Sequence, residues 1–398
     1  MKKHLFILFF SFLSVSAFSQ LWQQIADFAG TERDDPAAFV IGAKAYCGSG
    51  QIPWFISRND FYSFDMATEA WDTIAALPAG GRQYASAFSW GNEGFLFGGY
   101  DNSTYFSDLW KYDPLANAWT AASPIPAAGR MGCASFVING VAYLVGGRTT
   151  TNISINEVWA YDITNDSWQR KADLPFGARW RSAAAMQNNK GYLALGRDEN
   201  NHFCKELYEY DPIADAWTLI SVFPGAGRTY ASMLSFSNNL LIIAGLDSLG
   251  ANYNDMWRIS PDTLSWQQLN SIPSVERRGG AGFSSSTAVY YTTGVTQSGT
   301  RLKETWKVTN PLSVAEISKK ESINCYPNPA DGHCFITIPN AGKHTELEII
   351  DQSGRLLKTV HLEENTTQVE TAALANGLYL LRIRAGSTVY YSRVAVLH

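Results

Sequence analysis

The chain has 398 residues, of which 46% are hydrophobic and 13% aromatic, whereas only 17% are charged. This length allows two or three domains, and this composition excludes an intrinsically disordered protein. The formal net charge of -5 argues against a nucleic-acid partner, because nucleic-acid binding depends on neutralising phosphates.

Residues 1–19 have the features of a secretory signal peptide. Two lysines precede the apolar run LFILFFSFLSVSAF, and Ala17-Phe18-Ser19 has the small-x-small pattern at which signal peptidase cleaves. The alternative is an uncleaved membrane anchor, but the apolar run is short for a membrane span. Trp22, moreover, belongs to the repeat described next. We therefore predict that residues 1–19 are removed during export.

The sequence then repeats itself six times, over residues 20–310. An arginine and a tryptophan each recur every 48 or 49 residues and mark the register. They are Arg33, Arg82, Arg130, Arg179, Arg228 and Arg277, and Trp22, Trp71, Trp119, Trp168, Trp217 and Trp266. Such a period is typical of propellers and other repeat folds. Each unit contains four segments that predict antiparallel strands, separated by turn signals such as Asn139-Gly140.

The order of the markers predicts a closed ring. Trp22 precedes the first arginine, and Arg277 is followed by no tryptophan at the corresponding fourth-strand position. We expect the segment around Trp22 to supply the fourth strand of the last unit. Strands from both ends of the repeat region would then share one sheet, and the recurring tryptophans would pack between neighbouring sheets.

An acidic residue also precedes the third strand of every unit. These residues are Asp60, Asp108, Glu157, Glu206, Asp255 and Glu304. A catalytic group is needed once, whereas a structural group is needed in every unit. We therefore interpret the six carboxylates as structural partners of the six arginines.

The repeat resembles the kelch family. The glycine doublets Gly98-Gly99 and Gly146-Gly147, the tyrosine–aspartate pairs and the tryptophan about six residues later carry the resemblance. It covers about residues 20–310 and implies an all-β fold, a six-bladed kelch β-propeller closed by the N-terminal strand.

A different domain follows the repeats. Residues 311–324 are polar and are expected to form a linker, and residues 325–398 have the alternating pattern of a small β-sandwich. This tail resembles the C-terminal sorting domain of type IX secretion cargo. The matching motifs are Tyr326-Pro327-Asn328-Pro329, Ile350-Asp351 with Gly354-Arg355, and Gly377-Leu378-Tyr379.

The resemblance implies that residues 325–398 engage the type IX secretion machinery. The protein would then cross the outer membrane and reach the cell surface or the extracellular space. Family members often end in a basic residue after the last strand, whereas this chain ends in Leu397-His398.

Propeller topology places the loops after the second and fourth strands on one face, around the central channel. The residue types at these positions differ between units, as expected for a binding surface on a repetitive scaffold. Aromatic rings beside arginine and aspartate suit a sugar ring or a peptide; the alternative is ordinary loop packing. The candidate ligand-binding face comprises Trp54, Tyr84, Arg148, Trp180, Arg181, Arg197, Asp198, Tyr230 and Arg278.

Three functions are compatible with this face. The first is a monomeric binding module for a carbohydrate or protein ligand, which we favour because the loops between second and third strands are too short to form a lid. The second is a sugar mutarotase or epimerase of the sialic-acid mutarotase type, using Arg181, Arg197, Asp198 and Glu199. The third is a structural or adhesion component.

Metal chemistry is not expected. Some secreted kelch-type propellers are copper oxidases, but residues 20–310 contain a single histidine, His202, and copper sites need imidazole ligands. We predict no metal and no cofactor.

Overall fold

The computed structural model describes residues 21–150, 153–312, 324–337, 345–351, 355–362, 364–385 and 388–398. The chain divides into two compact units, and we call the unit that spans residues 20–313 the propeller and residues 314–398 the tail. The predicted signal peptide and most of the predicted linker lie outside the described residues. In the described part, no helix is long and apolar enough to cross a bilayer.

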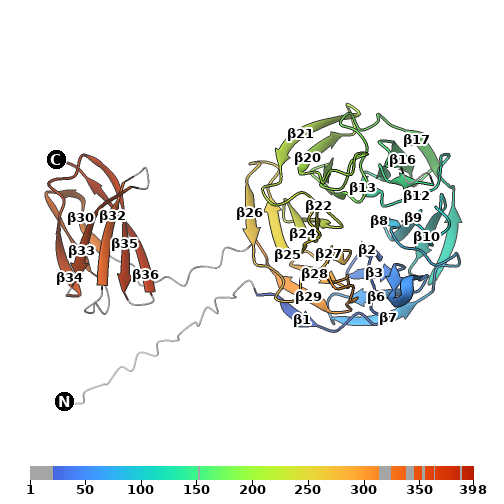
Figure 1. Ribbon diagram of the computed structural model, residues 1–398, viewed down its shortest axis with the longest axis horizontal. Helices are drawn as coiled ribbons and strands as arrows, with labels where there is room; N and C mark the ends of the chain where they lie inside the picture. The colour runs from blue at the N-terminus through green and yellow to red at the C-terminus, as the bar shows by residue number, and fades with distance from the viewer. Residues whose placement is uncertain are drawn as a thin grey trace, which may run out of the picture. The chain divides into compact units, whose positions relative to one another are not determined.

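The propeller consists of sheets arranged around a ring (Figure 1). We number these sheets as blades 1 to 6 in chain order. Blade 1 is β2 (Ala37–Ile41), β3 (Lys44–Gly48), β6 (Phe61–Asp65) and β7 (Ala70–Ile74); blade 2 is β8 (Ser86–Trp90), β9 (Glu93–Phe97), β10 (Leu109–Asp113) and β11 (Ala118–Ala122). Blade 3 is β13 (Ala134–Ile138), β14 (Val141–Val145), β16 (Val158–Asp162) and β17 (Ser167–Arg170); blade 4 is β18 (Ala183–Gln187), β19 (Lys190–Ala194), β20 (Glu206–Asp211) and β21 (Ala216–Val222).

The remaining blades complete the ring. Blade 5 is β23 (Ser232–Phe236), β24 (Asn239–Asp247), β25 (Asn252–Ile259) and β26 (Trp266–Leu269); blade 6 is β27 (Ala281–Ser284), β28 (Ala288–Thr292), β29 (Thr305–Thr309) and β1 (Gln23–Ile25). Shorter elements in the loops are β4 (Gln51–Ile52), η1 (Pro53–Phe55), β5 (Ile56–Ser57), β12 (Arg130–Met131), β15 (Arg148–Thr149) and β22 (Arg228–Thr229). The prediction of an all-β fold is confirmed.

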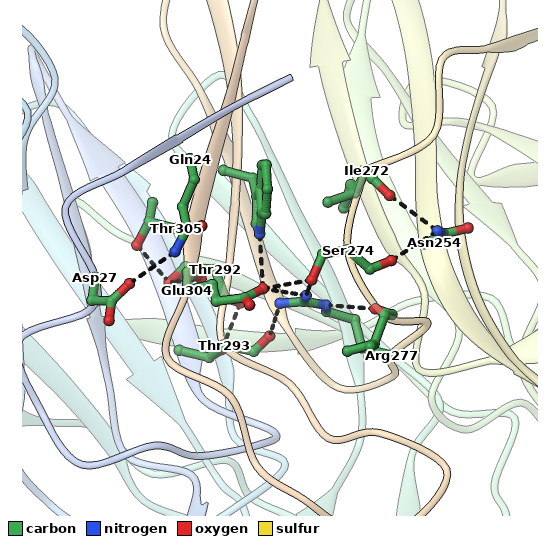
Figure 2. Close-up of polar contacts among 12 residues, drawn as sticks. Gln24, Asp27, Asn254, Ile272, Ser274, Arg277, Thr292, Thr293, Glu304 and Thr305 are labelled. Atoms are coloured by element: carbon green, nitrogen blue, oxygen red, sulfur yellow. Dashed lines mark hydrogen bonds and ion pairs between the residues drawn. The ribbon is translucent and has the colours of Figure 1, made fainter. Parts of the chain in front are cut away.

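Blade 6 combines strands from both ends of the repeat region. β1 pairs antiparallel with β29, so that Gln24 lies opposite Trp306. The indole Nε1 of Trp22 donates a hydrogen bond of 2.7 Å to the carbonyl oxygen of Asn270, which follows the last strand of blade 5. Figure 2 shows Gln24 beside Thr305 of β29. β1 thus fills the place that we expected for the segment around Trp22.

Five of the six repeat arginines form close ion pairs with the acidic residues before the third strands. The closest N···O distances are 2.8 Å in Arg33–Asp60, 2.6 Å in Arg82–Asp108, 2.8 Å in Arg130–Glu157, 2.6 Å in Arg228–Asp255 and 2.5 Å in Arg277–Glu304. In blade 6 the carboxylate of Glu304 also accepts hydrogen bonds from Ser274 and Trp306 (Figure 2). This geometry confirms the structural interpretation of the pairs. Blade 4 differs, because Arg179 approaches Glu206 only to 3.7 Å.

The recurring tryptophans join neighbouring blades. The indole of Trp119 donates to the carbonyl oxygen of Ala75, and that of Trp168 donates to the carbonyl oxygen of Ser123, each in the loop after the preceding blade. Apolar clusters span the same junctions, and β28 (AVYYT) is buried at every residue because neighbouring blades cover both of its faces. The core of the propeller therefore lies between the blades, whereas polar loop residues surround the mouth of the channel.

The tail is a second β unit with its own core. Its strands are β30 (Asn324–Asp331), β31 (His333–Thr337), β32 (Thr345–Ile350), β33 (Leu356–Leu362), β34 (Thr366–Glu370), β35 (Gly377–Ala385) and β36 (Thr388–Val396). They pair in the order β33-β32-β35-β36-β30-β31-β34. Ile336 and Val369, from one end of this order, share one buried cluster with Leu347 and Leu381 from the other. The strands therefore enclose a single core.

Candidate functional site

The loops at one end of the propeller form the same short ladder in every blade. The residue after each repeat arginine pairs antiparallel with a residue that follows the second strand. The six pairs are Asp34–Gln51, Gln83–Tyr100, Met131–Arg148, Trp180–Arg197, Thr229–Leu246 and Arg278–Val295. The structure thus brings together the two sets of loops that we predicted to share a face.

A glycine makes each ladder possible. In each pair, this glycine directly precedes the residue that follows the second strand. Its φ lies between +83° and +114° in all six blades. At Gly294, for example, an added Cβ would lie 3.0 Å from the carbonyl oxygen of Arg278. Only glycine combines this conformation with so close an approach of two backbones, which explains the second glycine of each doublet.

The next residue along the chain from each ladder forms an inner ring around the channel. The inner ring comprises Asp35, Tyr84, Gly132, Arg181, Tyr230 and Gly279, all with φ between +51° and +64°. Backbone hydrogen bonds of 2.7 to 3.4 Å join neighbours in this ring, such as Asp35 to Gly279 and Arg181 to Gly132. The order of the blades puts Asp35 across the channel from Arg181, and Tyr84 across from Tyr230.

A cavity of about 180 Å³ lies at this ring. Asp35, Tyr84, Arg181 and Tyr230 line it, together with both ring glycines and Cys133. The rings of Tyr84 and Tyr230 meet edge to face, with centroids 6.3 Å apart. The guanidinium carbon of Arg181 lies 3.9 Å from the centroid of Tyr84 and 3.7 Å from that of Tyr230. Four side chains of three chemical types, a carboxyl, a guanidinium and two phenols, therefore converge on one small space.

Asp35 is the most perturbed acid of this site. Burial raises its pKa to about 8, and the neighbouring charge of Asp34 adds to the effect, whereas Arg181 and Arg278 oppose it. Its Oδ2 has no hydrogen-bond partner among the described residues. The carboxylate of Asp34 itself forms an ion pair with Arg301, with 2.6 Å between Nε and Oδ1. At neutral pH, Asp35 is therefore mostly a protonated acid that can donate a hydrogen bond into the cavity.

A second layer of predicted residues surrounds the inner ring. The guanidinium carbons of Arg148 and Arg181 lie 4.0 and 4.2 Å from the ring of Trp180, which is buried. Arg197 exchanges two backbone hydrogen bonds of 3.0 Å with Trp180. Arg278 lies over Tyr230, at 4.8 Å.

Of the nine predicted residues, only Tyr84, Arg181 and Tyr230 line the cavity. Arg148, Trp180, Arg197 and Arg278 belong to the surrounding layer, and Trp54 and Asp198 lie outside both. Trp54 is 89% exposed on η1, with a left-handed φ of +67°. Asp198 accepts hydrogen bonds from the backbones of Asn200 and His202 and from the His202 ring, so it shapes its own turn. The residues that the prediction omitted are Asp35, Gly132 and Gly279. Their signal in the sequence is their position two residues after a repeat arginine.

Comparisons with known proteins agree with both units. A family model described as the KLHDC2/KLHL20/DRC7 Kelch-repeats domain matches residues 19–193, and one described as the Secretion system C-terminal sorting domain matches residues 324–397. The chain is a kelch-repeat β-propeller protein with a type IX secretion C-terminal sorting domain. The sorting domain implies an interaction with the type IX machinery and export across the outer membrane, to the cell surface or the extracellular space. This kelch protein is thus a secreted propeller.

Two individual proteins are similar to parts of the kelch protein. It is 36% identical over 103 residues to the N-acetylneuraminate epimerase of Vibrio cholerae serotype O1, a match that covers 24% of this chain and 27% of that protein. The chain therefore spans about a quarter of the length of this curated relative. The solved structure of YjhT superposes with a TM-score of 0.63 at 17% identity, over 71% of this chain and 95% of that one. The second likeness shows the fold alone.

Proposed function

We propose that this secreted propeller is a binding module for a carbohydrate, which it holds at the inner ring. The observation that carries the proposal is the contrast between a repeated backbone and varied side chains. All six ring positions have the same left-handed φ, which glycine adopts freely and which is strained for other residues. Two of the positions hold the residue that this conformation favours, Gly132 and Gly279. Asp35, Tyr84, Arg181 and Tyr230 occupy the other four positions at a conformational cost.

The chemistry of these four side chains suits a sugar. Arginine and tyrosine donate hydrogen bonds to hydroxyl groups, and a protonated Asp35 can both donate and accept. The aromatic edges supply apolar contact with a pyranose ring. The cavity of about 180 Å³ has room for one pyranose ring.

Titration calorimetry with sugars selected on a glycan array tests this proposal. We expect Tyr230→Ala to weaken binding at least tenfold, because it removes both ring contact and hydroxyl. Tyr105→Ala is the matched control, since the ring of Tyr105 contacts that of Tyr100 and does not line the cavity. Binding that survives Tyr230→Ala, or a protein that binds no sugar, would contradict the proposal. A structural or adhesion role would then be favoured.

A second candidate is a sugar mutarotase or epimerase. The partial match to N-acetylneuraminate epimerase supports it, as does an acid with a pKa of about 8 beside two arginines. Such a reaction needs one group to protonate the ring oxygen and another to take the proton of the anomeric hydroxyl group as the ring C–O bond breaks. Measuring the exchange of N-acetylneuraminate anomers by NMR tests it. We expect acceleration by the parent and its loss in Asp35→Asn; binding without acceleration would exclude it.

A further inference from the structure

The arginines around the channel fall into two groups. Each repeat arginine faces a carboxylate of its own blade. Arg148, Arg181, Arg197 and Arg278, by contrast, form no ion pair with a carboxylate in the part of the chain that the structure describes. The chain as a whole has a formal net charge of -5, so an unneutralised cluster of cations on one face is a local feature.

Arg148 and Arg197 are held in place by aromatic rings. Arg148 stacks on the buried ring of Trp180 at 4.0 Å, and Arg197 stacks on Phe203 at 4.3 Å. The backbones of Trp180 and Arg197 form one of the six ladders. We call Arg148, Trp180 and Arg197 the outer subsite. Because Arg181 also contacts Trp180, the outer subsite is continuous with the inner ring.

The outer subsite contains donors without acceptors. The Nε atoms of Arg148 and Arg197 and the Nε1 of Trp180 are buried, and none has a hydrogen-bond partner among the described residues. Burial lowers the pKa of Arg148, and the positive charge of Arg197 lowers it further. Unpaired buried donors and adjacent like charges are both destabilising. An anion placed between the two guanidinium groups would offset the repulsion between their charges.

We propose that the outer subsite binds an acidic group of a carbohydrate chain, so that the ligand of this propeller is an acidic oligosaccharide. The inference rests on the proposed binding of a sugar at the inner ring. Guanidinium groups bind carboxylate and sulfate through paired hydrogen bonds, and a stacked arginine is already oriented for them.

The surface beyond the outer subsite has room for a chain. Arg148 donates a hydrogen bond of 3.2 Å to the side-chain oxygen of Asn201. Asn201, His202 and Phe203 line a second cavity, of about 450 Å³, and Phe203 is also the residue on which Arg197 stacks. The ligand would extend from the inner ring over the guanidinium groups of Arg148 and Arg197 towards this cavity.

Calorimetric titration of the full chain tests the outer subsite. The probes are galacturonic acid and N-acetylneuraminic acid, their hexamers, a heparin hexasaccharide and neutral maltohexaose. We expect at least one acidic hexasaccharide to bind tenfold or more tighter than its single sugar and than maltohexaose. Arg148→Gln combined with Arg197→Gln should abolish that advantage, so that the acidic hexasaccharide binds no tighter than maltohexaose. The control Arg258→Gln removes a surface charge that contacts Gln267 and should change neither affinity.

The outcomes separate the two proposals. If the tightest-binding hexasaccharide is carboxylated or sulfated, that group is the one that the outer subsite binds, and either result supports the proposal. The outer subsite alone is overturned if the parent binds a single sugar but binds no acidic hexasaccharide more tightly. It is also overturned if the double variant still binds the acidic hexasaccharide more tightly. A parent that binds none of the probes overturns the proposed function and this inference with it. Thermal unfolding verifies that the double variant is folded.

Discussion

The propeller offers two arginines at equivalent positions whose surroundings differ, and this difference predicts different stabilities. Arg228 is 1% exposed and donates hydrogen bonds of 2.6 and 3.2 Å to Asp255 and of 3.2 Å to the carbonyl oxygen of Ala244. Arg179 approaches Glu206 only to 3.7 Å, and the Glu206 side chain is 38% exposed.

Replacing each arginine by methionine keeps most of the apolar volume and removes the charge. In Arg228→Met, Asp255 remains buried without its partner, which costs roughly 3–5 kcal/mol. In Arg179→Met, water can still reach Glu206, so we expect about 1 kcal/mol or less. For a unit of this size, the first change lowers the unfolding midpoint by roughly 6–15 °C and the second by a few degrees.

Thermal unfolding followed by near-ultraviolet circular dichroism measures both shifts, because the tryptophans report on the propeller. Adding Asp255→Asn to Arg228→Met should restore part of the loss, since it removes the unpaired charge. Equal shifts for Arg228→Met and Arg179→Met would refute the reasoning, because burial of the remaining carboxylate would then not determine the cost.

Three further predictions concern Asp35, Trp22 and the tail. Because the pKa of Asp35 is raised from 3.8 to about 8 in the folded state, stability should fall as pH rises through that window, and Asp35→Asn should flatten the dependence of the unfolding midpoint on pH. Trp22→Ala should cost about 3 kcal/mol or more in urea unfolding, since Trp22 is 6% exposed, whereas the control Leu21→Ala, at a residue 69% exposed, should have no effect. Without residues 325–398, the propeller should fail to cross the outer membrane and should collect in the periplasm, as cell fractionation would show. Export of the truncated chain would contradict the role of the tail.

The scaffold was predictable because its signals repeat. Arg33 to Arg277 and Trp22 to Trp266 recur in register, and each repetition reinforces a pattern that would be weak in a single unit. The pairing of β1 with β29 followed from the order of those markers alone. The loop positions around the channel were predictable for the same reason, since the topology fixes where each loop ends.

The chemistry of the site was less predictable because it depends on residues from several blades. The pKa of Asp35 is raised by burial and by the adjacent Asp34, and Arg181 and Arg278, which are far from it in sequence, oppose this shift. The longer separation of Arg179 from Glu206 has no signal in the sequence, where the repeat pattern is intact. Asp198 was a reasonable candidate by residue type, and only the structure shows that its carboxylate is used by its own turn.

The most direct test of the account is a crystal structure of this protein in complex with a sugar that it binds. We predict that one sugar ring lies within hydrogen-bonding distance of Asp35, Tyr84 and Arg181, in the cavity of the inner ring. A sugar seated instead on the exposed ring of Trp54, or on the outer strands of the blades, would contradict it.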